Sequence, residues 1–224
     1  MNGDLYWPEY GFNGMGDLPH LEGYKIILIE EVSDFNLCEG VSLPEIEGCT
    51  DCNYPNFDVW STVDDGSCDP LQIGDAIAGG IVFYLDESLE HGLVAAFEDV
   101  GSYEWGCYND YLNGADESDF GFGMQNTIDI VASCDDNETA AYICLNLNQN
   151  GYYDWYLPSI DELELMYINL HEQTDFLPAF YWSSSENSGS GNGSAQVYVC
   201  AGAEGYSTES SKSLEMDVRP IRSF

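Results

Sequence analysis

The densest group of side chains that could bind an ion lies between residues 48 and 69. This segment begins Gly-Cys-Thr-Asp-Cys-Asn-Tyr and ends Val-Asp-Asp-Gly-Ser-Cys-Asp. Carboxylates on a glycine-containing turn can supply the roughly six to eight oxygen ligands that Ca²⁺ takes. One interpretation is therefore a calcium site, with the candidate ligands Asp51, Asp58, Asp64, Asp65 and Asp69. Because the D-x-D-x-D-G spacing of an EF-hand loop is absent, the other interpretation is a disulfide-pinned turn with solvated carboxylates.

Eight cysteines, an even number, indicate a disulfide framework that forms in an oxidising compartment. Four of them lie between residues 38 and 68, and four are spread from 107 to 200. We predict pairing within each group: Cys49 with Cys68, Cys38 with Cys52, Cys134 with Cys144, and Cys107 with Cys200. The alternative for the first group is zinc at the C-x-x-C motif, although the second C-x-x-C that a zinc ribbon needs is missing.

Two segments carry the residue types that bind neutral sugars, namely aromatic rings beside short polar side chains on loops. The first runs from Tyr103 to Asn113 and the second from Glu186 to Tyr206. The candidate ligand-binding residues are Tyr103, Trp105, Tyr108, Asp110, Tyr111, Asn187, Asn192, Gln196 and Tyr206.

An enzymatic function has little support. His20, His91 and His171 are scattered along the chain, and no nucleophile elbow is present. Glycoside hydrolysis needs a pair of carboxylates, but so acidic a chain contains many possible pairs. Their presence therefore does not distinguish an enzyme from a binding protein. We therefore predict no catalytic residues and keep a carbohydrate-active enzyme only as a minor alternative.

The charge balance limits the partners. Among 224 residues, 41 are Asp or Glu and 4 are Lys or Arg, for a formal net charge of −37. Nucleic acids and anionic membranes are bound through basic surfaces, so we predict neither as a partner. Aromatic residues make up 14% of the chain, which distinguishes it from an acidic disordered tail. Repulsion between so many carboxylates favours salty surroundings or bound Ca²⁺.

The elements that must position these residues are short. Apolar runs between turn residues predict strands at residues 23–30, 78–85, 91–96, 195–201 and 214–221, the second and third forming a hairpin.

Three helices are also expected. Asn126-Thr127 would cap the first, which would run through Cys134, and Asn137 the second, which would end at Gly151. The third begins after Pro158, because Ser159 and Glu162 form a capping-box pattern ahead of an apolar face made of Leu163, Met166, Tyr167 and Leu170.

The start of the chain gives no export signal. Met1-Asn-Gly-Asp lacks both the charged start and the apolar stretch of a signal peptide, and no run of about 18 apolar residues could span a bilayer. Together with the cysteines, this predicts an extracellular protein that is either a fragment of a secreted chain or a virion component released by lysis.

Two short stretches resemble known modules. Tyr6-Trp7-Pro8 with Tyr10-Gly11-Phe12-Asn13-Gly14 resembles a module of surface proteins of marine bacteria and phages. The cysteine- and aspartate-rich segment that begins at Gly48 resembles the "GCTD…NY…DDGSC" repeat of extracellular and viral proteins.

The remaining chain resembles the C-terminal domain family of the collagen-like adhesin Lcl. The matching stretches are GGIVFY, HGLVAA, WGCY, NTIDIV, GYYDWYLPSIDEL, YWSSSE and VRPIRSF, in this order. The resemblance implies an α+β, C-type-lectin-like fold with short helices packed on antiparallel strands, a trimer, and binding of glycans or host surfaces. It also implies that Trp155 and Trp182 are core residues, and it favours the core over ligand contact for Trp105.

One departure from the family pattern matters. The best-known member binds sulfated polysaccharide through a basic surface, whereas this domain contains only Lys212, Arg219 and Arg222. A sulfated ligand is therefore not expected, and the two arginines are predicted to pair with helix carboxylates such as Asp161 or Glu162.

Together these observations predict three parts: a small β-rich attachment module (1–47), a disulfide-stapled linker (48–70) and a C-type-lectin-like domain (71–224). We expect a non-catalytic adhesin or decoration protein of a phage tail, fibre tip or virion, which recognises a host-surface glycan or protein and contacts other structural proteins of the particle. The alternative is a fragment or subunit of a secreted bacterial surface adhesin with the same lectin-like domain.

Overall fold

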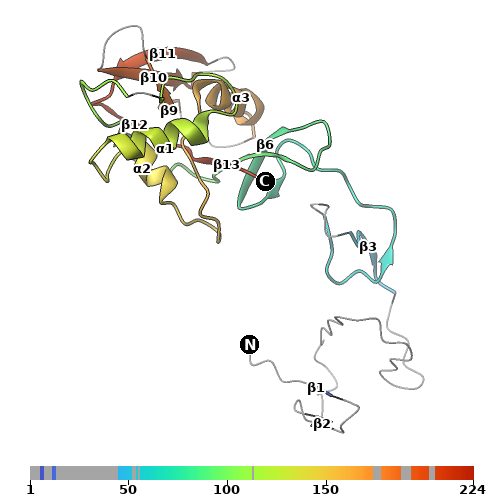
Figure 1. The fold of residues 1–224 in the computed structure, drawn as a ribbon. Helices are drawn as coiled ribbons and strands as arrows, with labels where there is room; N and C mark the ends of the chain where they lie inside the picture. The colour runs from blue at the N-terminus through green and yellow to red at the C-terminus, as the bar shows by residue number, and fades with distance from the viewer. Residues whose placement is uncertain are drawn as a thin grey trace. The chain divides into compact units, whose positions relative to one another are not determined.

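The structure, a computed structural model, describes residues 6–7, 12–13, 45–51, 54, 56–112, 114–173, 178–187, 193–201 and 205–224. The chain divides into two units, Met1–Pro44 and Glu45–Phe224 (Figure 1). In the first unit, β1 (Tyr6–Trp7) and β2 (Phe12–Asn13) pair antiparallel. The predicted strand at residues 23–30 and the predicted Cys38–Cys52 bridge lie outside the described residues.

The second unit begins with a short stapled segment, residues 45–70. Its strands β3 (Glu47–Gly48) and β4 (Val63–Asp64) form a parallel pair. The predicted disulfide between Cys49 and Cys68 is confirmed. The domain boundaries that we predict at residues 47 and 70 stay predictions.

Residues 71–224, here called the head, contain two sheets. The smaller has the strand order β13-β7-β6-β5 and is antiparallel throughout. The predicted hairpin is confirmed as β6 and β7. All four residues of β7 are buried, which explains their continuous apolar run. The strand bounds are β5 Ala76–Ile77, β6 Gly80–Leu85, β7 Gly92–Ala95 and β13 Ile221–Ser223.

The larger sheet has the order β11-β10-β9-β12-β8, in which β12 is parallel to β9 and the other pairs are antiparallel. Its strands are β8 Ser102–Glu104, β9 Phe180–Glu186, β10 Ser194–Val199, β11 Tyr206–Ser211 and β12 Glu215–Asp217. The single strand predicted at 214–221 is therefore wrong. The chain passes from the larger sheet to the smaller one between β12 and β13, at Pro220, which has no N–H for a ladder.

The third predicted helix is confirmed as α3 (Ile160–Leu170), with both hydrogen bonds of the Ser159–Glu162 capping box present. Glu162 is fully buried, and its carboxylate accepts hydrogen bonds from the Ser159 N–H (2.8 Å) and the Gly121 N–H (3.1 Å). Burial raises the pKa of Glu162 despite these bonds.

Both other predicted caps are wrong. Helix α1 (Gly123–Ser133) begins three residues before Asn126, and its N-cap Phe122 makes no side-chain cap bond. The buried Thr127 instead uses its hydroxyl to bond the Gly123 carbonyl inside the helix, at 2.7 Å. Helix α2 (Ala140–Leu145) is capped by Thr139 rather than by Asn137, because the Thr139 hydroxyl accepts a bond from the Tyr142 N–H at 3.2 Å.

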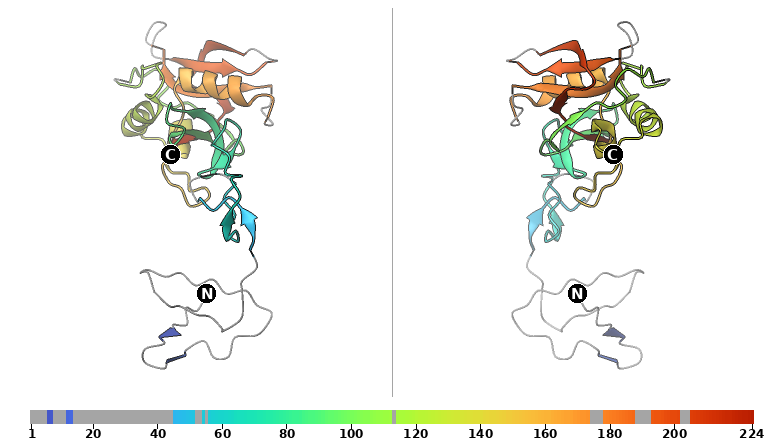
Figure 2. Two further views of the ribbon diagram at one scale, coloured as in Figure 1. Left: turned by 90° about the vertical axis from the view of Figure 1, so that its right-hand side faces the viewer. Right: turned by 90° about the vertical axis from the view of Figure 1, so that its left-hand side faces the viewer.

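Helices cover both faces of the larger sheet (Figures 1 and 2). On one face, Tyr181 and Tyr198 pack with the apolar side of α3. On the other, Trp182 and Val197 pack with residues of α1 and α2. The head is thus an α+β domain of few short helices on mostly antiparallel sheets. In the described residues, no helix is long and apolar enough to cross a membrane.

The disulfide pairing predicted for the second cysteine group is wrong. Cys107 is bonded to Cys134, while Cys144 and Cys200 are free, buried thiols. Cys200 belongs to the α3 side of the core, whereas Cys107 packs against the α1/α2 side, so the larger sheet separates them. Burial raises the pKa of Cys144, and it raises the pKa of Cys200 to about 12.

Peptide mapping without reductant should therefore recover the pairs Cys49–Cys68 and Cys107–Cys134, with Cys144 and Cys200 as thiols. Both thiols should resist a maleimide reagent in the native protein, because they are buried and protonated, and should react once denaturant is added. Rapid labelling of either thiol in the native state, or a bridge that involves one of them, would contradict the fold described above.

Candidate functional site

The most prominent exposed aromatic residues of the first predicted segment lie on residues 107–112, here called the tyrosine loop. Tyr108 is 52% exposed and Tyr111 is 46% exposed, and Asp110 is also exposed. Fixed aromatic rings beside polar groups offer the surface that binds a sugar face or a protein side chain.

A buried ion pair fixes the loop from beneath. Glu186, the last residue of β9, and Lys212, the residue after β11, have no exposed side-chain surface and form a close salt bridge. The Lys212 ammonium also donates to the Asp110 carbonyl at 2.8 Å. The second carboxylate oxygen of Glu186 accepts from the Leu112 N–H at 2.9 Å. Both members of the ion pair thus hold the loop's backbone as well as each other.

Trp105 forms part of this support and does not contact solvent. Its side chain is fully buried, its indole N–H donates to the Ser183 carbonyl at 2.8 Å, and Lys212 lies 4.5 Å from its ring centroid. The prediction of Trp105 as a ligand-binding residue is therefore wrong, because a buried ring cannot contact a ligand. Its N–H bond and cation–π contact instead stabilise the base of the loop.

The backbone of the loop is constrained in two further ways. The Cys107–Cys134 disulfide ties the start of the loop to the end of α1. Cys107 and Asn109 have φ angles of 46° and 70°, in the left-handed region, which asparagine tolerates and a cysteine seldom adopts. Such conformations persist only where surrounding contacts determine them, and they concentrate at binding sites.

The tyrosine loop borders the end of the β9–β10 hairpin at which β9 ends with Glu186 and β10 begins with Ser194. A Cβ atom added at Gly193 would lie 3.3 Å from the Tyr108 ring, so the ring is adjacent to that backbone. Asn187 is half-buried and its N–H bonds the Ser194 carbonyl at 3.3 Å. The structure thus brings Asn187 near Tyr108, as the two predicted segments require, while Asn192 lies outside the described residues.

Tyr111 is oriented by an acidic neighbour. Its hydroxyl donates to the Asp116 carboxylate at 3.1 Å, and this hydrogen bond raises the pKa of Tyr111. The ring of Tyr111 is therefore held by its polar end while 46% of the residue stays exposed.

The other predicted ligand residues do not join this group. Tyr103 is half-buried in the core and bonds the Val100 carbonyl through its hydroxyl. The Gln196 amide donates to the Ser118 hydroxyl at 2.9 Å. Tyr206 is exposed but pairs with Val199, five residues along β10 from Ser194. At about 3.3 Å per residue, that separation is roughly 16 Å, so Tyr206 lies at the opposite end of the sheet.

In the described part of the chain, every lysine and arginine is buried. Lys212, Arg219 and Arg222 are 0%, 3% and 7% exposed. Arg219 pairs with Asp99, and Arg222 pairs with Asp154. The predicted arginine partners, Asp161 and Glu162, are therefore wrong, because Glu162 caps α3 instead. A surface that carries carboxylates and no exposed Lys or Arg among these residues disfavours anionic ligands.

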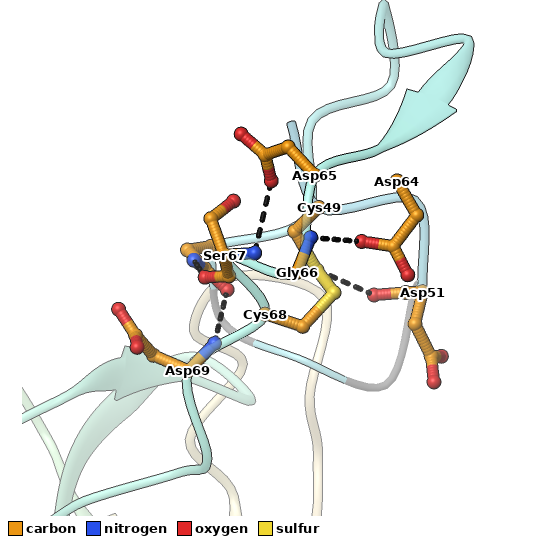
Figure 3. Close-up of a disulfide and its surroundings, with 9 residues drawn as sticks. Cys49, Asp51, Asp64, Asp65, Gly66, Ser67, Cys68 and Asp69 are labelled. Atoms are coloured by element: carbon orange, nitrogen blue, oxygen red, sulfur yellow. Dashed lines mark hydrogen bonds between the residues drawn. A yellow bond between two sulfur atoms is a disulfide. The ribbon is translucent and has the colours of Figure 1, made fainter. Parts of the chain in front are cut away.

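Four aspartates of the stapled segment, Asp51, Asp64, Asp65 and Asp69, do not converge on one point (Figure 3). Asp58, Asp64 and Asp65 accept bonds from the N–H groups of Trp60, Gly66 and Ser67, each at 2.9 Å and each two residues further on. Asp51 and Asp69 point elsewhere. Within the described residues, no three His, Cys, Asp or Glu side chains are grouped to hold a metal ion. The calcium site at these aspartates stays a prediction, and no function is derived through it.

No protein-family model matches the chain, and no curated protein matches it. The features that bear on function are therefore the tyrosine loop and the charge of the surface around it.

Sequence reasoning missed Lys212 and Glu186 as the residues that position the loop. A signal was present, since Lys212 is the first lysine or arginine after Lys25. A single cation kept in so acidic a stretch predicts a specific carboxylate partner. The sequence does not indicate which of the many carboxylates pairs with Lys212, because the fold alone brings Glu186 to it.

Proposed function

We propose that this chain is a non-catalytic binding protein whose tyrosine loop contacts a host-surface glycan or protein. The observation that carries the proposal is the pair of exposed rings, Tyr108 and Tyr111, on a backbone held by a buried ion pair and a disulfide. A binding loop that is ordered before it meets its ligand avoids part of the entropic cost of association.

The charge of the surface narrows the ligand. Because the described residues place no exposed Lys or Arg beside the tyrosine loop, a sulfated, sialylated or phosphorylated ligand would find no counter-charge. A neutral glycan, or a neutral to basic protein surface, suits the exposed rings and the nearby carboxylates.

The family resemblance supports a proposal for the fold, the oligomeric state and the location of the protein. We infer a C-type-lectin-like head of the Lcl C-terminal type, trimeric, at the tip of a phage fibre or on a virion, with a bacterial surface adhesin as the alternative. The two disulfides support an oxidising, extracellular location. Repetition of weak sites on one particle would raise the overall avidity by about 10²–10⁴ over a single site.

A glycan array probed with the full chain, with and without Ca²⁺, tests the proposal. The double variant Tyr108→Ala/Tyr111→Ala should reduce binding to any neutral glycan that the native chain recognises by about tenfold or more, the range expected for aromatic anchors. Tyr153→Ala is the matched control, because Tyr153 is 68% exposed and is not part of the tyrosine loop.

Two results would overturn the glycan arm of the proposal. One is equal binding by the double variant and by Tyr153→Ala. The other is selective binding of sulfated glycans, which would require a cationic surface that the described residues do not form. If no glycan binds, the test is a pull-down of host-surface proteins with the native chain, the double variant and Tyr153→Ala. The native chain and Tyr153→Ala should then capture the same protein, and the double variant should capture less of it.

A further inference from the structure

A cleft of about 740 Å³ lies between the stapled segment and the turn that joins β6 to β7. Its volume is within the range of about 300–1,000 Å³ that is typical of small-molecule sites. Asp51 and Tyr54 line it from the stapled segment, and Leu71, Ile77 and Phe224 line it from the head. The turn contributes four consecutive residues, Ser88–His91.

The head side of the cleft is a fixed surface. Leu71, Ile77 and Phe224 pack against a buried cluster that includes Val94 and Trp155. The chain entering the head is also held, because the Gln72 N–H donates to the Asp75 carboxylate at 2.8 Å. These apolar side chains therefore form a preformed floor.

A disulfide limits the movement of the stapled segment, which forms the other wall of the cleft. The Cys49–Cys68 disulfide joins the start of the segment to its end, and Asn56 bonds both the Ser67 carbonyl and the Asp69 N–H. Pro70, which also lines the cleft, follows directly. The disulfide thus keeps the loop that carries Asp51 and Tyr54 near the point where the segment joins the head.

Leu89 is the residue that folding alone does not explain. It is 46% exposed, and its φ angle of 62° is in the left-handed region, which disfavours a bulky side chain. Glycine or asparagine would adopt this φ angle at lower cost. Because Leu89 is exposed, burial of its side chain does little to offset that cost. Asp86 fixes the turn by accepting bonds from Ser88, and the turn directs Leu89 into the cleft. A contact with a bound apolar group would account for the leucine.

The polar lining is acidic. Asp51 and Glu90 line the cleft together with His91, and the described lining residues include no lysine or arginine. The only cations described in this unit are buried in ion pairs elsewhere. Attraction of a positive group to these carboxylates is reinforced by the net charge of −37 on the whole chain.

We propose that this cleft binds a small organic cation, an ammonium or guanidinium group attached to an apolar body. The apolar body lies on the Leu71, Ile77 and Leu89 side chains, and the cationic group faces Glu90 and Asp51. This site is separate from the tyrosine loop and does not depend on the function proposed for it.

Three probes with one ring and different charges test the assignment: benzylamine, benzyl alcohol and benzoate. In ¹H–¹⁵N spectra of the full chain, benzylamine should shift the amides around the cleft, benzyl alcohol should shift the same amides at higher concentration, and benzoate should not. Shifts spread over the surface, or binding of benzoate equal to that of benzylamine, would overturn the proposal.

Two matched variants separate a binding role from a structural one. Glu90→Gln should weaken benzylamine about tenfold, whereas Glu87→Gln, which removes the same charge from the same turn outside the cleft lining, should change it less than twofold. Leu89→Gly should weaken benzylamine while leaving the melting temperature unchanged or higher, because it relieves the left-handed leucine. A lower melting temperature with unchanged affinity would show that Leu89 is structural and overturn the site.

Discussion

Lys212→Met is expected to lower the free energy of unfolding by about 3–5 kcal/mol, the cost of leaving one charge of a buried pair without its partner. Methionine keeps most of the apolar stem, so the loss comes from the charge. The Glu186 carboxylate would remain buried with only the Leu112 N–H as a described donor, and the Asp110 carbonyl would lose its ammonium. Denaturant unfolding followed by circular dichroism measures the change.

A second variant and a control identify the cause. In Lys212→Met/Glu186→Gln no uncompensated charge remains, so part of the lost stability should return. Arg222→Met is the matched control, since its partner Asp154 is 50% exposed and can be solvated when the arginine is removed. If Arg222→Met costs as much as Lys212→Met, burial of the ion pair is not the reason for the loss.

Three tryptophans that are buried among the described residues, Trp105, Trp155 and Trp182, should respond differently to replacement by phenylalanine. Trp105 and Trp182 each donate an indole bond, to the Ser183 carbonyl at 2.8 Å and to the Tyr103 carbonyl at 2.9 Å. The Trp155 indole N–H has no acceptor among the described residues. Trp105→Phe removes a hydrogen bond to a buried carbonyl and Trp182→Phe removes one to a partly buried carbonyl, so both should cost about 1–3 kcal/mol more than Trp155→Phe.

Thermal and denaturant unfolding of the three single variants checks this order. All three lose a similar volume from the core, so the cavity contribution is matched and the hydrogen bond is the variable. Equal losses at all three positions would mean that the indole bonds contribute nothing to stability. For Trp105→Phe, ligand binding by the folded fraction should be retained, because the ring lies beneath the tyrosine loop and not at its surface.

Local patterns in the sequence predict local structure well here. The capping box of α3, the β6–β7 hairpin and the Cys49–Cys68 bridge all depend on residues close in the chain, and all three are confirmed. The failures involve long-range competition. Asn126 and Thr127 have side chains suited to capping, but the fold buries them inside α1 to bond Glu117 and Gly123.

The same distinction holds for the candidate site. Exposed aromatics at Tyr108 and Tyr111 follow from composition and turn chemistry, whereas the burial of Trp105 and the remote position of Tyr206 depend on strand register. The pairing of Cys107 with Cys134, and of each cation with its carboxylate, depends on which segments a sheet places side by side. The spacing of residues in the sequence does not predict which segments become neighbours.

The burial of Lys212, Arg219 and Arg222 has a consequence for proteolysis. Trypsin cleaves only after lysine or arginine, and residues 26–211 contain neither. Of the three later cations, Arg219 precedes Pro220, and trypsin does not cleave such a bond. The other two, Lys212 and Arg222, are buried in the folded head and held in ion pairs. In its native state the head therefore presents trypsin-like proteases with no accessible bond in its described residues, and a cut after Lys212 or Arg222 would report local unfolding.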